Sequence, residues 1–223
     1  MTTLILAPHA DDETLGAGGL IARLRDEGQR VVVAAMTTRG PETPPVASSA
    51  GRDVRGEFRA AMAVLDAEVM FGELPAVALD HIPAWRTNQA VQAVIEEVQP
   101  DQLLVPFTHD LHKDHAAIAY AGTVATRPYL TLGATVKRLM AYETLSETHL
   151  APPGLQPGFE PTVFVDITAQ LERKLEAMRC YATQLQDDNK PRSARGLTAL
   201  ATLRGCHIGV AAAEAFVLLR ERL

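Results

Sequence analysis

Three short, uninterrupted apolar runs limit most strongly what this chain can fold into; they cover residues 4–7, 31–36 and 103–107. An apolar run without polar alternation is typical of a strand that is buried on both faces, as in a parallel sheet. Segments with helical spacing of apolar residues follow or separate these runs, at residues 13–27, 52–65, 82–98 and 116–125. Strands that alternate with helices predict an α/β fold with a Rossmann-like, mostly parallel sheet and helices on both faces.

Weaker patterns extend this arrangement towards the end of the chain. We expect short strands at residues 69–71, 137–142 and 162–165, and helices at residues 167–185 and 211–222. Two Pro- and Gly-rich segments, 40–51 and 151–161, are too short to link independent domains, and loops of this length often form lids or binding walls. The sequence therefore predicts one domain over residues 1–223.

Charge and hydropathy exclude several classes of protein. The net charge of −6 argues against a broad basic surface for nucleic acid or for anionic membrane. The sequence contains neither an apolar window long enough to span a membrane nor the pattern of a signal peptide. We expect a cytoplasmic protein that acts on a small molecule, and the sequence leaves a homo-oligomer open.

A histidine and three acids come directly after the first expected strand: His9, Asp11, Asp12 and Glu13. Ligands of an open parallel sheet bind beyond the carboxyl ends of its strands, so these side chains are expected at that edge. One interpretation is structural, with an aspartate capping the next helix and Glu13 in its first turn, where the helix dipole favours it. The other is that a cation lies among carboxylates that would otherwise repel one another.

A second polar cluster follows the strand expected at residues 103–107. Residues 108–115 contain three histidines, His109, His112 and His115, together with two aspartates. The structural interpretation is a solvated polar loop before a helix that Asp114 caps. Because both clusters are expected at one edge of the sheet, their imidazole and carboxylate groups also suit Zn²⁺, and three protein ligands would leave a position for water. The two clusters together predict a metal-assisted hydrolase.

The motifs PHADDE at residues 8–13 and HKDH at residues 112–115 resemble those of the LmbE-like family, also called the PIG-L family. Weaker similarities lie at residues 55–65, 164–168 and 213–216. The resemblance implies a zinc-dependent enzyme with one zinc ion per chain. Such an enzyme removes the N-acetyl group from an N-acetylglucosamine-type conjugate and releases acetate and a free amine. A small glycoconjugate is then the expected partner.

The resemblance also implies a role for each residue of the two motifs. His9, Asp12 and His115 match the zinc ligands, and Asp11 matches the general base. His112 matches a histidine that, when protonated, stabilises the oxyanion of the tetrahedral intermediate. Zinc would lower the pKa of a water molecule, and the oxyanion contact would stabilise the transition state.

Substrate contacts are less strongly indicated. Arg52 and Arg55 both lie near Glu57 in a segment that resembles a family helix, and either arginine could face a sugar hydroxyl. His109 is additional to the motif, and substrate contact is one of its possible roles. Ala10 stands where the family usually has proline, which affects the stiffness of the turn and removes no functional side chain.

Two other functions stay open at this stage. A metal-dependent phosphoesterase would use similar ligands, although it would usually need a second metal or a clamp of arginine and lysine around the phosphate. A non-catalytic sugar-binding module would not require Asp11 beside Asp12, nor His112. Gly16, Gly18 and Gly19 do not match a dinucleotide-binding motif, and we interpret them as close packing between helix and sheet.

Overall fold

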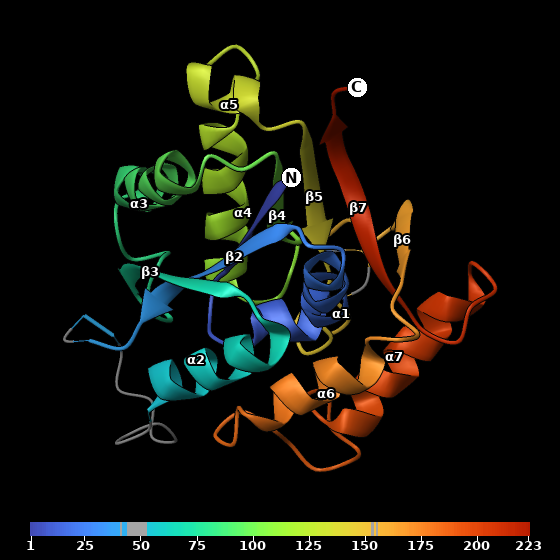
Figure 1. The fold of residues 1–223 in the computed structure, drawn as a ribbon. Coiled ribbons are helices and arrows are strands. Elements are labelled where there is room, and N and C mark those ends of the chain that lie inside the picture. Colours follow the sequence, from blue (N-terminus) through green and yellow to red (C-terminus); the bar gives the residue numbers. More distant parts are fainter. Residues whose placement is uncertain (41, 44–52, 153, 155) are drawn as a thin grey trace.

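The computed structural model describes residues 1–223 except 41, 44–52, 153 and 155 (Figure 1). In this part of the chain a seven-stranded sheet has the order β3-β2-β1-β4-β5-β7-β6. Its strands are β1 (Thr2–Ala7), β2 (Arg30–Thr38), β3 (Glu68–Pro75), β4 (Gln102–Pro106), β5 (Arg138–Tyr142), β6 (Val163–Asp166) and β7 (Ala213–Glu221). The expected strands are therefore all present. The Pro- and Gly-rich segment at residues 40–51 lies almost wholly outside the described residues.

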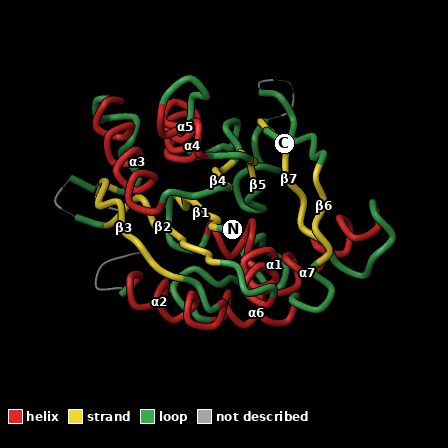
Figure 2. Tube along the Cα trace, turned by 45° about the horizontal axis from the view of Figure 1, so that its top comes forward, coloured by secondary structure: helices red, strands yellow, loops and turns green. Residues whose placement is uncertain are grey.

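Helices cover both faces of this sheet, and in Figure 2 they lie above and below the strands. One layer packs on one face and consists of α1 (Asp12–Asp26), α2 (Val54–Leu65), α6 (Leu171–Arg179) and α7 (Ala194–Cys206). The other face carries α3 (Ala84–Val98), α4 (Lys113–Ala125) and the short α5 (Thr131–Thr135). The α/β fold with a mostly parallel sheet is thus confirmed. None of the helices in the described part of the chain is long and apolar enough to cross a lipid bilayer.

The order of the parallel strands decides where a ligand can bind. β1 pairs in parallel with β2 on one side and with β4 on the other, so that Ile5 lies beside both Val33 and Leu104. The chain therefore runs away from β1 in opposite directions, first towards β3 and later towards β5. Such a switch point leaves a crevice beyond the carboxyl ends of the two central strands. Both polar clusters of the sequence follow these two strands.

The prediction of a helix at residues 211–222 is wrong, because this segment forms β7. β7 runs antiparallel to both β5 and β6 and lies between them. Alanine, leucine and glutamate favour helices locally, but pairing on both edges and burial of Ala213–Phe216 outweigh that preference. The helix expected at residues 167–185 covers only Leu171–Arg179. It begins later than expected because Asp166 accepts a hydrogen bond from the Thr168 backbone N–H and forms a turn before α6.

Glycines in α1 allow the close packing that the sequence indicates. A Cβ atom on Gly16 would lie 2.3 Å from the Tyr142 ring, and one on Gly19 would lie 2.6 Å from Ile167. No real Cβ atom tolerates such distances, so both positions require glycine. The first turns of α1 are thereby held against the ends of β5 and β6, and the residues before α1 are fixed at the crevice.

Candidate metal centre and active site

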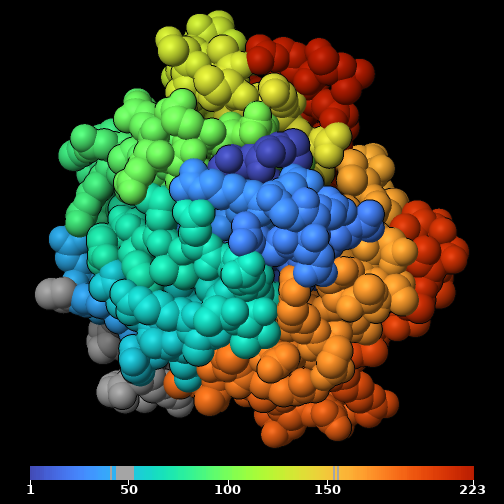
Figure 3. Space-filling view, in the orientation of Figure 1, coloured from blue at the N-terminus to red at the C-terminus, as the bar shows by residue number. Residues whose placement is uncertain are grey.

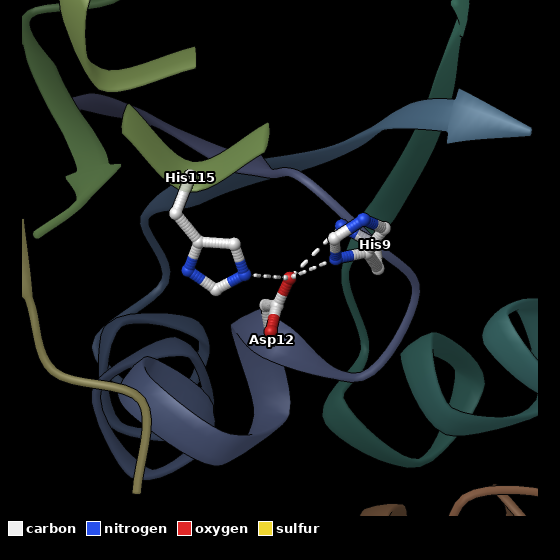
Figure 4. Close-up of side chains that lie close together, drawn as sticks. All are labelled: His9, Asp12 and His115. Carbon is white, nitrogen blue, oxygen red and sulfur yellow. Dashed lines mark hydrogen bonds and ion pairs between the residues drawn. The ribbon is translucent and has the colours of Figure 1, made fainter. Parts of the chain in front are cut away.

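The two polar clusters meet at the carboxyl ends of β1 and β4. His9 lies on the turn between β1 and α1, Asp12 is the first residue of α1, and His115 lies on the first turn of α4 (Figure 4). The Asp12 carboxylate is between the two histidines: its Oδ2 atom is 3.3 Å from His9 Nδ1 and 3.2 Å from His115 Nε2. One atom from each residue lies within 4.8 Å of the others, as ligands of one ion must.

A second carboxylate orients each of these histidines. His9 Nε2 is 2.9 Å from Asp114 Oδ2, and His115 Nδ1 is 2.8 Å from Asp110 Oδ2. Each imidazole thus has one nitrogen on an orienting carboxylate and the other nitrogen facing Asp12. This pairing fixes the tautomer of a metal-binding histidine and raises its basicity. The three candidate ligands and the two carboxylates that orient the histidines fit a divalent cation such as zinc.

His9, His112 and Asp114 form another group of donors within 4.8 Å of one another. This group fits a cation less well, because both oxygens of Asp114 already have partners. Oδ1 accepts the Leu79 backbone N–H at 3.0 Å, and Oδ2 accepts the Val77 N–H at 2.7 Å. Asp114 therefore holds the loop after β3 and orients His9. It is not the helix cap that the structural interpretation expects, since His112 occupies the N-cap position of α4.

The electrostatics of the site reflect this crowding. Burial alone would lower the pKa of His9, but hydrogen bonds to Asp114 and Asp12 outweigh burial and raise it to about 9. Burial would raise the pKa of Asp12, but the charge and hydrogen bond of His115 lower it far below its ordinary range. Positive charge on the histidines thus balances Asp12 in the described structure. A bound divalent cation would supply that positive charge instead.

Asp11 stands apart from the three candidate ligands. It occupies the N-cap position of α1, yet its side chain makes no capping hydrogen bond within the described residues, so the simple helix-cap interpretation fails for its carboxylate. Its φ of 133° is unusual for an L-residue. The Glu13 carboxylate accepts the Asp11 backbone N–H at 3.1 Å. Burial and the charge of Asp12 raise the pKa of Asp11 well above its ordinary value, while Arg192 opposes that rise.

His112 has a defined tautomer in this geometry. Its Nδ1 accepts the Asp114 backbone N–H at 3.1 Å, so the imidazole proton lies on Nε2. Burial and the neighbouring charge of His9 lower the pKa of His112 to about 4. The hydrogen bond at Nδ1 therefore fits a neutral His112 with an Nε2–H donor, whereas the resemblance implies the protonated form.

A cavity of about 340 Å³ opens beside this centre. Asp11, Asp12 and His112 are part of its wall, and so are arginines from distant segments: Arg39, Arg55 and Arg192. The packing of α2 against α6, seen side by side in Figure 3, brings the C-terminal third of the chain to this wall. A cavity of this size, lined by both polar and apolar side chains, suits a sugar-sized ligand.

The substrate candidates of the sequence have different positions. Arg55 lines the cavity, forms an ion pair with Glu73 and lies 4.2 Å from the centroid of the Phe71 ring. Arg52 lies outside the described residues. Glu57 accepts two hydrogen bonds from Thr183, at 3.0 and 2.6 Å, and is not part of the cavity lining. The same holds for His109, which contacts Gln156 at 3.1 Å.

Sequence reasoning did not assign three residues that the structure brings to the centre. Asp110 and Asp114 lie inside the histidine-rich stretch, and the spacing of Asp110 from His115 could have identified Asp110 as an orienting carboxylate. Asp114 orients His9, which lies 105 residues earlier, so no local spacing indicates its role. Arg192 lies in the segment between α6 and α7, and no local pattern connects that segment to Asp11. This contact depends on the packing of the C-terminal helices.

Comparisons with known proteins agree with this site. The model of the PIG-L family, described as GlcNAc-PI de-N-acetylase, matches residues 4–126, which contain both motifs. A 1D-myo-inositol 2-acetamido-2-deoxy-alpha-D-glucopyranoside deacetylase from Mycobacteroides abscessus is 29% identical, over 99% of this chain and 93% of the relative.

Solved structures share the fold. N,N'-diacetylchitobiose deacetylase from Pyrococcus horikoshii is similar with a TM-score of 0.76 and 22% identity, over 98% of this chain and 83% of that one. A 4-carboxy-2-hydroxymuconate hydratase from Pseudomonas putida has the same TM-score at 19% identity, over 100% and 97%. The fold thus also occurs in a hydratase, so the fold alone does not assign the family. The assignment depends on the family model, whose match spans both motifs. The chain belongs to the PIG-L family of de-N-acetylases.

Proposed function

We propose that this protein is a zinc-dependent amide hydrolase that removes the N-acetyl group from an N-acetylglucosamine-type conjugate. The observation that carries the proposal is the separation of two adjacent carboxylates. Asp12 lies between His9 and His115, whereas Asp11 lines the cavity and contacts neither histidine. One acid can hold a cation while its neighbour stays available for proton transfer. The family match and the deacetylase relative support the same chemistry.

His9, Asp12 and His115 would hold the zinc ion. When bound, zinc would supply Lewis-acid polarisation of the acetyl carbonyl and make a water molecule in the site more acidic. Asp11 would accept the proton of the attacking water at its carboxylate. The same group would then return a proton to the departing sugar amine, which completes hydrolysis to acetate and a free amine.

His112 would stabilise the developing oxyanion as a neutral donor. Its Nδ1 is occupied by the Asp114 N–H, which leaves Nε2–H for a contact with the acetyl oxygen. A neutral donor can act in this way without a charge, because the group is already oriented before the reaction. Loss of one such donor typically reduces kcat by about 10²–10³.

A matched pair of variants tests the division between Asp11 and Asp12. D11N should keep about one zinc per chain and lose most turnover, because an amide cannot accept the proton. D12N should lose zinc, because it removes the ligand between the histidines. The measurements are zinc content by elemental analysis and acetate release from N-acetylglucosamine conjugates, and treatment of the wild-type protein with a chelator should abolish acetate release.

Two results would contradict this proposal. D11N at wild-type rates would remove Asp11 as the base, and D12N with full zinc content would remove Asp12 as a ligand. The phosphoesterase alternative predicts phosphate release from a sugar phosphate, and the binding-only alternative predicts affinity without release of any product.

A further inference from the structure

Arg192 lines the active-site cavity with hydrogen-bonding capacity that its neighbours do not use. Its Nη1 atom is 3.5 Å from Asp11 Oδ2 and 3.3 Å from Gln184 Oε1, both at the long end of hydrogen-bond distances. Its Nε atom is buried and has no hydrogen-bond partner among the described residues. A buried N–H group without a partner is unfavourable, so an acceptor group on a bound ligand would stabilise this guanidinium.

The chain holds this arginine in place before any ligand binds. The Arg192 backbone N–H donates to Gln186 Oε1 at 3.2 Å, and its carbonyl accepts the Gln186 N–H at 3.0 Å. The next residue, Ser193, caps α7 by accepting the Gly196 N–H at 2.9 Å. Because the backbone is fixed on both sides, less conformational entropy is lost when the guanidinium binds an anion.

The cavity lining contains two further arginines, which differ in their partners. Arg39 follows β2, is exposed and has no ion pair within the described ranges of the chain. Arg55 differs, since Glu73 pairs with it. Among the acids of the lining, Asp53 caps α2 by accepting the Gly56 N–H at 2.8 Å. Glu147 is half-buried, and burial raises its pKa.

We propose that the substrate carries an acidic group, a phosphate or a carboxylate, next to its N-acetylated sugar, and that Arg192 binds this group with Arg39 as a second cation. This inference rests on the proposed deacetylase function. Guanidinium groups match both anions, because their parallel N–H donors meet two oxygens at once. Arg192 would then determine specificity, and Asp11 would keep its separate role as the base.

The test compares three N-acetylglucosamine derivatives that differ in the group at C1. These are the 1-phosphate, the glycoside of glycolic acid and the neutral methyl glycoside. Acetate and inorganic phosphate are both measured with the zinc-loaded protein, and kcat/KM is determined for the wild type, R192Q and R192K. The variant R195Q is the matched control: Arg195 lies on α7 three residues away, is exposed and contacts Asn189 outside the cavity.

We expect the wild type to prefer at least one acidic derivative over the methyl glycoside by roughly tenfold or more, the effect of a hydrogen bond to a charged group. R192Q should reduce that ratio towards one, R192K should retain part of it, and R195Q should leave it unchanged. The derivative with the larger ratio identifies the phosphate or the carboxylate as the preferred anion.

The outcomes separate this inference from the deacetylase proposal. Acetate release with equal kcat/KM for all three derivatives, or a preference that survives in R192Q, would overturn the anion site and leave the deacetylase standing. Phosphate release without acetate release would overturn the deacetylase function itself.

Discussion

At the scale of single residues, Glu13 explains how a strained Asp11 is held at the cavity. Glu13 is fully buried, and its Oε2 accepts the Asp11 N–H. Its Oε1 accepts hydroxyl hydrogen bonds from Thr14 at 2.6 Å and from Tyr181 at 2.5 Å. The third acid of the motif is therefore neither a ligand nor a simple first-turn residue. It fixes the backbone conformation that directs Asp11 away from the histidines.

The contact between Tyr181 and Glu13 can be tested without touching the reacting groups. Y181F removes one donor from Glu13, so Asp11 should be held less rigidly and kcat should fall about tenfold or more, while KM and zinc content stay unchanged. Y120F is the control, because Tyr120 is an exposed tyrosine on α4. Steady-state kinetics measures the effect, and a wild-type kcat for Y181F would contradict this role.

At the scale of elements, β7 is held in the sheet by a buried ion pair as well as by its two neighbouring strands. Glu214 on β7 lies 2.6 Å from Lys174 Nζ on α6, and both side chains are almost completely buried. The same carboxylate accepts the backbone N–H groups of Gly19 and Leu20 at 2.8 and 2.7 Å, and Lys174 donates to the Leu15 carbonyl. One residue pair therefore joins β7, α6 and α1, which begins at the active site.

E214Q should lower the free energy of unfolding by about 3–5 kcal/mol, because it leaves the Lys174 ammonium buried without its counter-charge. E221Q at the end of β7 is the matched control. Its partner Arg138 is 42% exposed, so loss of that pair should cost less than about 1 kcal/mol. Urea unfolding measures both variants, and equal costs would contradict the role assigned to the Lys174–Glu214 pair.

At the scale of the whole molecule, the end of β5 is joined to α7 by a charged network. Arg204 on α7 donates to both carboxylate oxygens of Glu143, at 2.8 and 2.6 Å, and His149 contacts the same carboxylate at 2.7 Å. Burial would raise the pKa of Glu143, but the hydrogen bonds from His149 and Arg204 outweigh burial and lower it. The folded protein therefore favours the ionised carboxylate.

This shift gives the stability of the protein a defined pH dependence. The pKa of Glu143 is lower in the folded state than in the unfolded state. The stabilisation that ionised Glu143 gives the fold is therefore fully present above the ordinary glutamate pKa of about 4.3, and it is lost as the pH falls through the pKa of the folded state. E143Q should thus cost about 3–5 kcal/mol at pH 7, and the difference from the wild type should shrink below pH 4. Urea unfolding at several pH values measures it, and a difference independent of pH would contradict the assignment.

Much of the parallel half of the fold was predictable from the sequence, because strands buried on both faces need continuous apolar runs. The C-terminal third was less predictable. β7 consists largely of helix-forming residues, and only its position between β5 and β6 makes it a strand. α7 carried a local signal that we did not use, since Ser193 before an apolar helical pattern is a typical N-cap.

The sequence by itself placed the two polar clusters at one edge of a parallel sheet, because PHADDE and HKDH follow two strands whose carboxyl ends meet there. The resemblance of these motifs to the family implied which residues are the candidate ligands and which is the base. Only the tertiary structure decided which nitrogen of each histidine faces Asp12, which tautomer His112 has, and that Arg192 reaches the cavity beside Asp11. The physical reason is that local spacing fixes a residue's place along a strand or helix. Hydrogen-bond partners and long-range charge contacts arise only when segments distant in sequence pack together.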